Sequence, residues 1–311
     1  IERYLHDGPP ELPSVSDLSI DDLKQKAQDA ADEKVWGLCR HYLLELFARG
    51  FEPSRTACNL ARLSSEQDRN GEAVEWYRRE LELDPNNRED HEGLIFLLDC
   101  HPDTTAQDAL HERVRYFEKF GAAAYALRQP HRNTPDPDRP LKIGYVTGDW
   151  NFHSASVAFV TAVSEHSDGY IAYAYSTLHP DNADNVTKEW KRHLGTRYLE
   201  CYGLYPSQLA AVIRHDEIDI LVDLSGYTAK NRLQTFAYRP APIQAQAWGY
   251  VLGSGSPAID VIFADPVVAP PSVQSSLMER VYHLPSLLGF KPYDTMEGQT
   301  DLPCLTKPPV F

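Results

Sequence analysis

The stretch IDILVDLSGYTAKNRLQTFAYRPAPIQAQAWGY, residues 218–250, contains two largely apolar runs separated by a polar, helix-like segment. Runs of this kind are typical of strands that are buried on both faces of a sheet. Pro240 and Pro242 force the residues before them into extended geometry, which directs the second run into a strand. Because strands that alternate with helices form parallel sheets, this stretch predicts an α/β fold.

The same pattern extends to both sides of this stretch. Four further runs are short and largely apolar, and helix-like segments separate most of them. They are LKIGYV (141–146), YIAYAYS (170–176), DVIFAD (260–265) and RVYHLP (280–285). We therefore predict a Rossmann-like lobe over residues 141–300, with a mainly parallel sheet covered on both faces.

The amino-terminal half has a different pattern, in which apolar residues recur at helical spacing. Small and packing residues fall where a 34-residue tetratricopeptide repeat places them. They are Leu60, Ala61, Ala73, Tyr77 and Pro85. We expect an all-α region of tetratricopeptide-like helical repeats over residues 1–129, with an ordinary helical bundle as the alternative, and a proline-rich linker over residues 130–140.

The composition limits the possible partners. The 311-residue chain has 45 acidic and 30 basic residues and a formal net charge of −15, which repels phosphate backbones and anionic lipids. Neither nucleic acid nor a membrane is an expected partner, since no apolar run approaches the roughly 18 residues of a membrane span and no signal peptide is recognisable. The five cysteines have no zinc-ligand spacing, which predicts no metal site and a reducing compartment, the cytoplasm or the nucleus.

A histidine follows the first predicted strand of the lobe. After LKIGYV come Asp149 and then His153, just before a helix that we expect to begin near Ser154. Ligands of open α/β sheets gather at the carboxyl ends of the strands. The helix dipole disfavours protonation of His153 and keeps a nitrogen available to accept a proton, which suits a general base. The alternative is that His153 caps the helix while Asp149 satisfies turn amides.

Three further strand ends carry candidate binding residues. Residues 225–232 form a glycine turn with hydroxyl and basic side chains, in which Tyr227 and Thr228 could hold sugar hydroxyls or a phosphate. The glycines of AWGYVLGSGSPAID (247–260) would let backbone amides approach a ligand closely. Asp265 could bind a ligand but is more typical of a turn before proline. No Walker or GxGxxG loop follows any strand, which argues against NTP hydrolysis and NAD chemistry.

Together, the repeat-like helices and the motifs GYVTGDWNFHS, DEIDILVDLSGYTAKNRLQTFAYRPAPIQAQAWGY, GSGSPAID and ERVYHLP resemble the protein O-GlcNAc transferase family. This is glycosyltransferase family 41, which includes the plant O-fucosyltransferase branch. The resemblance covers about residues 135–295. It implies tetratricopeptide repeats followed by a metal-independent GT-B catalytic unit, with two Rossmann-like lobes and the active site in the cleft between them.

The resemblance implies roles for five residues. Asp149 and His153 match the family's DxxxH turn, in which the histidine lies at the active site and has been proposed as a base. Trp248, Gly249 and Val251 match the LGYPGTSG loop, which approaches the donor sugar. This chain departs from the loop, with Val-Leu where proline and glycine are usual, and it has His-Ser-Ala where animal members have His-Pro-Thr. The resemblance therefore does not identify the sugar.

The resemblance also implies an activity. We expect the amino-terminal part of an inverting protein O-glycosyltransferase that transfers GlcNAc from UDP-GlcNAc to Ser or Thr, with no cofactor besides this co-substrate. O-fucosyl or N-glucosyl transfer on the same scaffold, or a non-catalytic repeat-based interaction scaffold, are the alternatives. The acceptor protein or peptide is expected on the repeats.

The family pattern implies a second lobe after this chain. Residues 301–311 are expected to begin the connection to that carboxyl-terminal lobe, which supplies most uridine diphosphate contacts in the family. The lobe would lie in the same chain or in another one. We expect the 311 residues alone to show no transfer.

Overall fold

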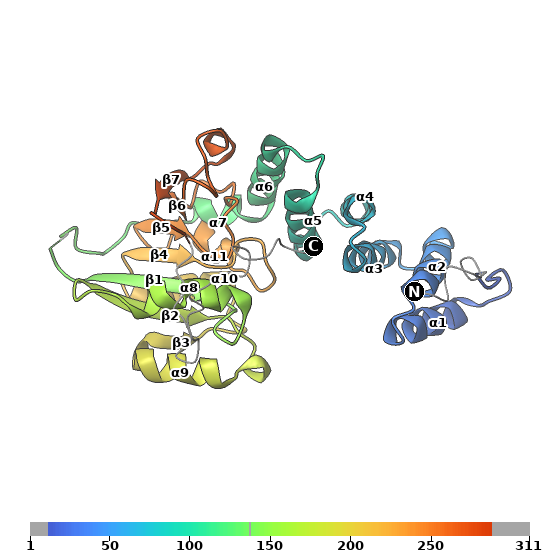
Figure 1. Cartoon of the computed structure of the whole chain (residues 1–311), viewed down its shortest axis with the longest axis horizontal. Coiled ribbons are helices and arrows are strands. Elements are labelled where there is room, and N and C mark those ends of the chain that lie inside the picture. Colours follow the sequence, from blue (N-terminus) through green and yellow to red (C-terminus); the bar gives the residue numbers. More distant parts are fainter. Residues whose placement is uncertain (1–11, 137, 288–311) are drawn as a thin grey trace, which may run out of the picture.

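The computed structural model describes residues 12–136 and 138–287 (Figure 1). Its amino-terminal half is a row of helices that pack against their neighbours in chain order. They are α1 (Ile20–Asp32), α2 (Trp36–Ala48), α3 (Pro53–Glu66), α4 (Asn70–Leu83), α5 (Arg88–Cys100), α6 (Ala106–Phe120) and α7 (Ala122–Ala126). Helical pairs of the tetratricopeptide type, expected from the repeat spacing, are confirmed.

Local sequence signals explain where several of these helices begin. The Ser19 side chain caps α1, and Asp22 returns the contact to the Ser19 N–H, which forms a capping box. Thr105 and Asp108 form the same arrangement at the start of α6. Pro53 occupies the first position of α3, where its missing N–H has no intrahelical partner to lose.

The carboxyl-terminal half is built on a seven-stranded sheet in the order β3-β2-β1-β4-β5-β6-β7, in which all neighbouring strands are parallel. The strands are β1 (Leu141–Thr147), β2 (Tyr170–Ser176), β3 (Tyr198–Glu200), β4 (Ile220–Asp223), β5 (Ile243–Gln246), β6 (Val261–Ala264) and β7 (Arg280–His283). The predicted α/β fold is confirmed, but the sequence pattern missed β3, whose three residues are too few to show a periodic signal.

Helices cover the two faces of the sheet in separate groups. They are α8 (Ser154–Ser164), α9 (Asn185–Leu194), α10 (Pro206–His215) and α11 (Leu233–Ala237). Phe159 of α8 and Trp190 of α9 pack with Tyr145 of β1 on one face. Ile213 of α10 packs with Val146 of β1 on the other face. Adjacent residues of one strand therefore enter opposite cores, which is why the strands read as continuous apolar runs.

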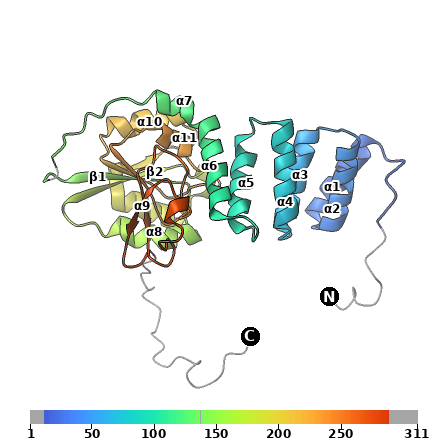
Figure 2. The same cartoon turned by 90° about the horizontal axis from the view of Figure 1, so that it is seen from above.

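The last helical pair belongs to the core of the sheet half. Ile95 of α5 and Tyr116 of α6 lie in the same buried cluster as Tyr227 and Tyr250, which follow β4 and β5. The helices α1 to α4 continue the row away from the sheet (Figure 2). The helical half therefore joins the sheet through side chains of α5 and α6 as well as through the linker.

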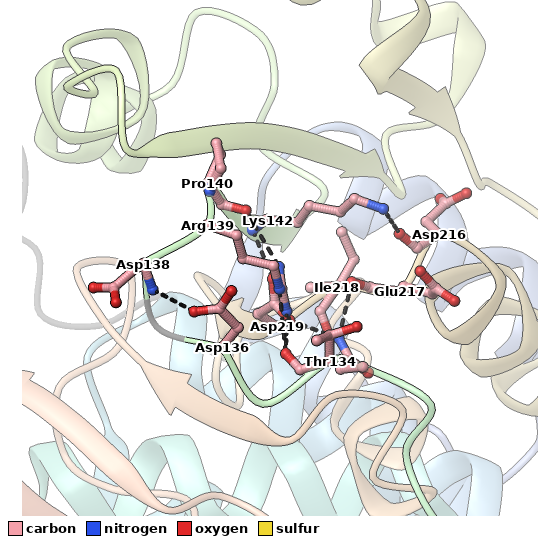
Figure 3. A network of polar contacts seen from close by, with 11 residues as sticks. Thr134, Asp136, Asp138, Arg139, Pro140, Lys142, Asp216, Glu217, Ile218 and Asp219 are labelled. Atoms are coloured by element: carbon pink, nitrogen blue, oxygen red, sulfur yellow. Dashed lines mark hydrogen bonds and ion pairs between the residues drawn. The ribbon is translucent and has the colours of Figure 1, made fainter.

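The linker connects the two halves, and hydrogen bonds also hold it at the amino ends of β1 and β4. Arg139 donates from both terminal nitrogens to the two carboxylate oxygens of Asp219, at 2.6 and 2.8 Å, and the Lys142 N–H donates to Asp219 at 2.9 Å (Figure 3). Asn133 adds a third donor at 2.7 Å. Although burial raises the pKa of Asp219, these hydrogen bonds, that of Arg139 first, lower it below its ordinary value.

The predicted domain limits fall between observed elements. The helix α7 ends at Ala126 and β1 begins at Leu141, while residues 288–311, including the predicted end of the lobe and the predicted connection, lie outside the described residues. Within the described residues, no helix combines the length and the apolar character needed to cross a membrane.

Candidate functional site

The carboxyl ends of β1 and β4 form the candidate site. The two strands are neighbours, with Ile143 paired to Ile220 and Val146 to Asp223. The chain leaves β1 toward α8 on one face and leaves β4 toward α11 on the other. This is a topological switch point, the place where open α/β sheets bind their ligands.

Hydrogen bonds and a buried tryptophan hold the turn after β1 in place. Thr147 Oγ1 accepts hydrogen bonds from the Asp149 N–H at 3.1 Å and from the Ser225 hydroxyl at 3.0 Å, which ties the turns after β1 and β4 together. Trp150 is fully buried and packs edge-on against Phe159 of α8. The Asp149 side chain is largely buried, whereas 51% of the His153 side-chain surface is exposed.

His153 is the cap of α8. The ring nitrogen Nδ1 of His153 accepts a hydrogen bond from the Ala155 N–H at 3.2 Å. The backbone N–H of His153 donates to the Ser156 hydroxyl oxygen, also at 3.2 Å. Capping, the alternative that the sequence left open, is therefore observed. Because Nδ1 is the acceptor, the proton of the neutral ring lies on Nε2, and His153 presents an N–H donor outward.

This arrangement constrains the predicted role of His153 as a base. The lone pair that would accept a proton faces the Ala155 N–H, and Asp149 Oδ2 lies 3.8 Å from the same nitrogen. The ring takes a proton only after it releases the cap or exchanges its tautomer. In the observed geometry His153 can donate to an oxygen of a bound ligand, and Asp149 is the neighbouring carboxylate.

Buried hydrogen bonds shape the turn after β4. Asp223 is fully buried and accepts from the N–H groups of Ser225 and Gly226 and from the side chain of Gln246. Burial raises the pKa of Asp223. Gly226 has a φ of +54°, and a Cβ there would lie 2.3 Å from Tyr250. Only glycine fits this turn, which brings Tyr250 under the carboxyl end of β4.

Two predicted binding residues in this turn serve the packing. Tyr227 is 3% exposed and its hydroxyl donates to the Ser254 carbonyl at 2.6 Å, so contact with a sugar would require this interface to open. The Thr228 hydroxyl donates back to the Ser225 carbonyl at 2.8 Å. The exposed residues of the turn are Ala229 and Lys230, and the Lys230 side chain lies against Gly148 at the end of β1.

The turn after β5 carries the other three predicted residues. Trp248 donates from its indole N–H to the Leu287 carbonyl at 2.8 Å and stacks on Phe263. Gly249 cannot carry a side chain, since a Cβ would lie 1.8 Å from the Leu224 carbonyl oxygen. Val251 lines a cavity of about 220 Å³ between this turn and the helical half, and so faces away from β1.

Asp265, after β6, closes a turn. Its carboxylate accepts from the N–H groups of Val267, Val268 and Leu287, each at 2.9 Å, and these contacts hold its pKa below the ordinary value. Turn closure was the interpretation that the sequence favoured for this residue.

A buried polar cluster ties the turn after β5 to the last helical pair. Arg113 of α6 pairs with Asp99 of α5, and both contact the Tyr250 hydroxyl, with Arg113 Nη2 3.1 Å from it. Gly255 lies directly on α6, because a Cβ there would be 2.5 Å from Arg113 Cβ. The helices therefore fix the position of residues 250–255, a contact that no local sequence pattern revealed.

The structure groups the sequence-predicted residues unevenly. Asp149 and His153 lie together at the end of β1, and the side chain of Lys230 from the turn after β4 lies against Gly148. Trp248 and Gly249 follow β5, two places along the sheet from β1. Among the described residues, no group of three or more His, Cys, Asp or Glu side chains is placed to hold a metal ion.

A parallel sheet in this strand order, covered by helices on both faces and with a switch point between β1 and β4, defines the class of open, doubly wound α/β proteins. The sequence profile of the family described as Glycosyl transferase family 41 matches residues 110–293. The chain belongs to this family, as the motifs around Asp149 and residues 218–250 indicated.

Known relatives have plant and bacterial sources. The chain is 34% identical over 225 residues to a rice protein named probable UDP-N-acetylglucosamine–peptide N-acetylglucosaminyltransferase SPINDLY; this match covers 70% of the chain and 24% of the rice protein. It is 30% identical over 149 residues to an Arabidopsis thaliana protein named probable UDP-N-acetylglucosamine–peptide N-acetylglucosaminyltransferase SEC; this match covers 47% of the chain and 15% of the Arabidopsis protein.

A solved structure supports the fold. A mutant of the Thermobaculum terrenum O-GlcNAc transferase superposes with a TM-score of 0.65 at 23% identity, over 90% of this chain and 60% of the bacterial one. At that identity the likeness shows the fold. The chain spans about a quarter of the length of the rice, tomato and petunia relatives.

Proposed function

We propose that this chain is the amino-terminal part of an inverting protein O-glycosyltransferase that transfers GlcNAc from UDP-GlcNAc to Ser or Thr. The observation that carries the proposal is the family match across residues 110–293, the segment that places Asp149 and His153 at the switch point of the sheet. The activity for which the plant relatives are named supports the choice of sugar and acceptor.

The proposed reaction is a single displacement. The acceptor hydroxyl oxygen forms a bond to the anomeric carbon, the bond from that carbon to the nucleotide phosphate breaks, and the nucleoside diphosphate leaves with the electron pair. The hydroxyl proton passes to a base beside His153, directly or through water. General-base catalysis of this kind contributes a factor of about 10² to 10⁴ in rate. The Nε2–H of His153 can donate a hydrogen bond to an oxygen of the nucleotide sugar. Asp149 is the neighbouring carboxylate.

The helical half is the proposed acceptor site. A groove of about 710 Å³ between α1, α2 and α3 is lined by polar and apolar side chains in similar measure, which suits an extended peptide. The second catalytic lobe is proposed to come from sequence beyond Phe311 or from another chain, and to supply the stabilisation of the leaving group. A cytoplasmic or nuclear location follows from this proposal.

Labelled-sugar incorporation tests the proposal. UDP-GlcNAc, GDP-fucose and UDP-glucose are compared side by side, with residues 1–311 alone and with the second lobe present. We expect transfer from UDP-GlcNAc only when both lobes are present, and loss of it in His153→Ala but not in His111→Ala, which alters an exposed histidine of α6.

Other outcomes have defined meanings. Robust transfer by residues 1–311 alone would overturn the need for a second lobe. Preference for GDP-fucose or UDP-glucose would assign the chain to another sugar on the same scaffold. Absence of transfer from all three donors, with peptide binding retained by both histidine variants, would favour the interaction scaffold.

A further inference from the structure

The turn after β4 carries two cations and lies against the carboxyl ends of two neighbouring strands. The Lys230 side chain lies against Gly148, which follows β1, and its backbone carbonyl accepts from Thr177, which follows β2. Arg232 is half-buried two residues further on. We call Lys230 and Arg232 the cationic turn.

Neither cation has a carboxylate partner among the described residues. Lys230 makes no side-chain hydrogen bond or ion pair there, and Arg232 makes one long contact, 3.5 Å to the Asn231 carbonyl. The Nε of Arg232 is buried without any hydrogen-bond partner. A buried guanidinium nitrogen that lacks an acceptor costs free energy unless a ligand supplies one.

Two carboxylates of neighbouring elements are already paired. Glu92 pairs with Arg88 at 2.5 Å and accepts from the Tyr116 hydroxyl, while Glu200 pairs with Lys191 at 2.6 Å. Burial lowers the pKa of Arg232, and the nearby charge of Arg88 lowers it further. The negative charge of Glu92 acts in the opposite direction and compensates the charge of Arg232 in part, although no ion pair joins the two side chains.

Lys230 is one of seven non-glycine residues with a positive φ in the described part of the chain. Its φ is +66°, a left-handed conformation in which a side chain other than that of glycine is strained. Such strain persists where the surroundings impose it and gathers at ligand sites. Glycine would fit this position more easily, but it would remove the cation beside Gly148.

We infer that the cationic turn is an oxyanion-binding site that receives a phosphate or carboxylate group of a substrate at the switch point of the sheet. The inference rests on the proposed function for the identity of that substrate. The two sources are the diphosphate of the donor and an acidic side chain of the acceptor peptide. Both groups carry negatively charged oxygens that accept hydrogen bonds. In the described part of the chain, the side chains of Lys230 and Arg232 have no such partner.

Binding assays on residues 1–311 test the site without relying on transfer. The probes are inorganic pyrophosphate, UDP, a glutamate-rich serine peptide and the same peptide with glutamine in place of glutamate. We expect Lys230→Gln and Arg232→Gln each to weaken binding of the responsive probe about fivefold, as loss of one exposed charge contact permits. Lys188→Gln, which removes an exposed lysine of α9, is the matched control and should bind as the parent does.

The probe that responds identifies the source. Weakening confined to pyrophosphate and UDP assigns the site to the donor, and weakening confined to the acidic peptide assigns it to the acceptor. Unchanged affinity of both variants for all four probes overturns the site, as does failure of the parent chain to bind any of them. Lack of transfer in the sugar assay would leave these affinities unaffected and would refute only the proposed reaction.

A second variant separates binding from packing. Lys230→Gly should raise the melting temperature, because it relieves the left-handed backbone, and should still weaken binding of the responsive probe about fivefold. Lys230→Arg should restore binding. A lysine kept only for packing would show the opposite pattern, with loss of stability and no loss of affinity in the glycine variant.

Discussion

His153 combines two tasks whose energies can be measured separately. The cap that it gives to α8 satisfies the Ala155 N–H, and side-chain caps of this kind are worth about 1 kcal/mol. The proposed contact with substrate uses the other ring nitrogen. His153 thus stabilises the helix through Nδ1, and in the proposed reaction it contacts the substrate through Nε2. A variant can keep the cap while losing the substrate contact.

Comparison of His153→Asn with His153→Ala separates these tasks. Asparagine is a good helix cap and alanine is not, so only the alanine variant should lose about 1 kcal/mol in the free energy of unfolding. Both variants should lose sugar transfer in the two-lobed enzyme. Thermal unfolding and labelled-sugar incorporation give the two readouts, and an asparagine variant with parental transfer would show that His153 contributes only its cap.

At the scale of elements, α4 contains a buried acid that its partners satisfy only in part. Glu80 is fully buried, its Oε1 accepts from Ser54 at 3.1 Å and Asn87 at 3.0 Å, and its Oε2 has no partner. Burial raises the pKa of Glu80, and the neighbouring charge of Asp90 adds to this effect. Folding therefore favours the protonated form of Glu80 over the ionised form.

The sign of the pH dependence follows from this pKa. Between the ordinary glutamate pKa and the raised folded value, the folded state binds more protons than the unfolded state, so the contribution of Glu80 to stability falls as pH rises. We expect Glu80→Gln to be more stable than the parent by about 1 kcal/mol at pH 8, with the difference shrinking toward pH 4. Chemical denaturation across this range measures it.

A matched control lies on the same helix. Glu82 is exposed and pairs with Arg79 at 2.7 Å, so Glu82→Gln should change the free energy of unfolding little at any pH. Equal stabilities of the parent and Glu80→Gln from pH 4 to pH 8 would contradict a raised pKa at Glu80.

Periodicity and turn chemistry predict most elements but not the contacts between distant ones. The apolar runs after residue 140 predicted six of the seven strands, and the turn before Ser154 predicted the placement of His153. The pairing of Arg139 with Asp219 joins residues 80 positions apart, and Arg113 and Tyr250 are 137 positions apart. No local pattern encodes such pairs, so the burial of Tyr227 could not be foreseen from its place in a polar turn.

At the scale of the whole molecule, the buried clusters do not follow the division at the linker. Ile95 and Tyr116 belong to the core of the sheet half, whereas the cluster of α1, α2 and α3 is separate. A third cluster joins α3, α4 and α5. The unit that shares a core with the sheet therefore begins at α5, about forty residues before the linker in sequence.

Two shortened chains test this boundary. Residues 88–311 keep α5 and α6 on the sheet and should unfold cooperatively, although loss of α4 exposes Leu94 and Leu98. Residues 130–311 leave Tyr227 and Tyr250 uncovered and should lack a cooperative transition. Thermal unfolding followed by near-ultraviolet circular dichroism measures both, and a sharp transition in residues 130–311 equal to that of residues 88–311 would place the boundary at the linker.

The cluster of Asp99, Arg113 and Tyr250 bears on how repeat arrays and catalytic lobes can be recombined. A chimaera made by joining foreign repeats at the linker would bring α5 and α6 helices that lack a partner for the Tyr250 hydroxyl. Grafts made before α5 would leave that partner in place. Gain or loss of repeats during evolution is accordingly least disruptive at the outer end of the row, and the innermost pair is inherited with the lobe.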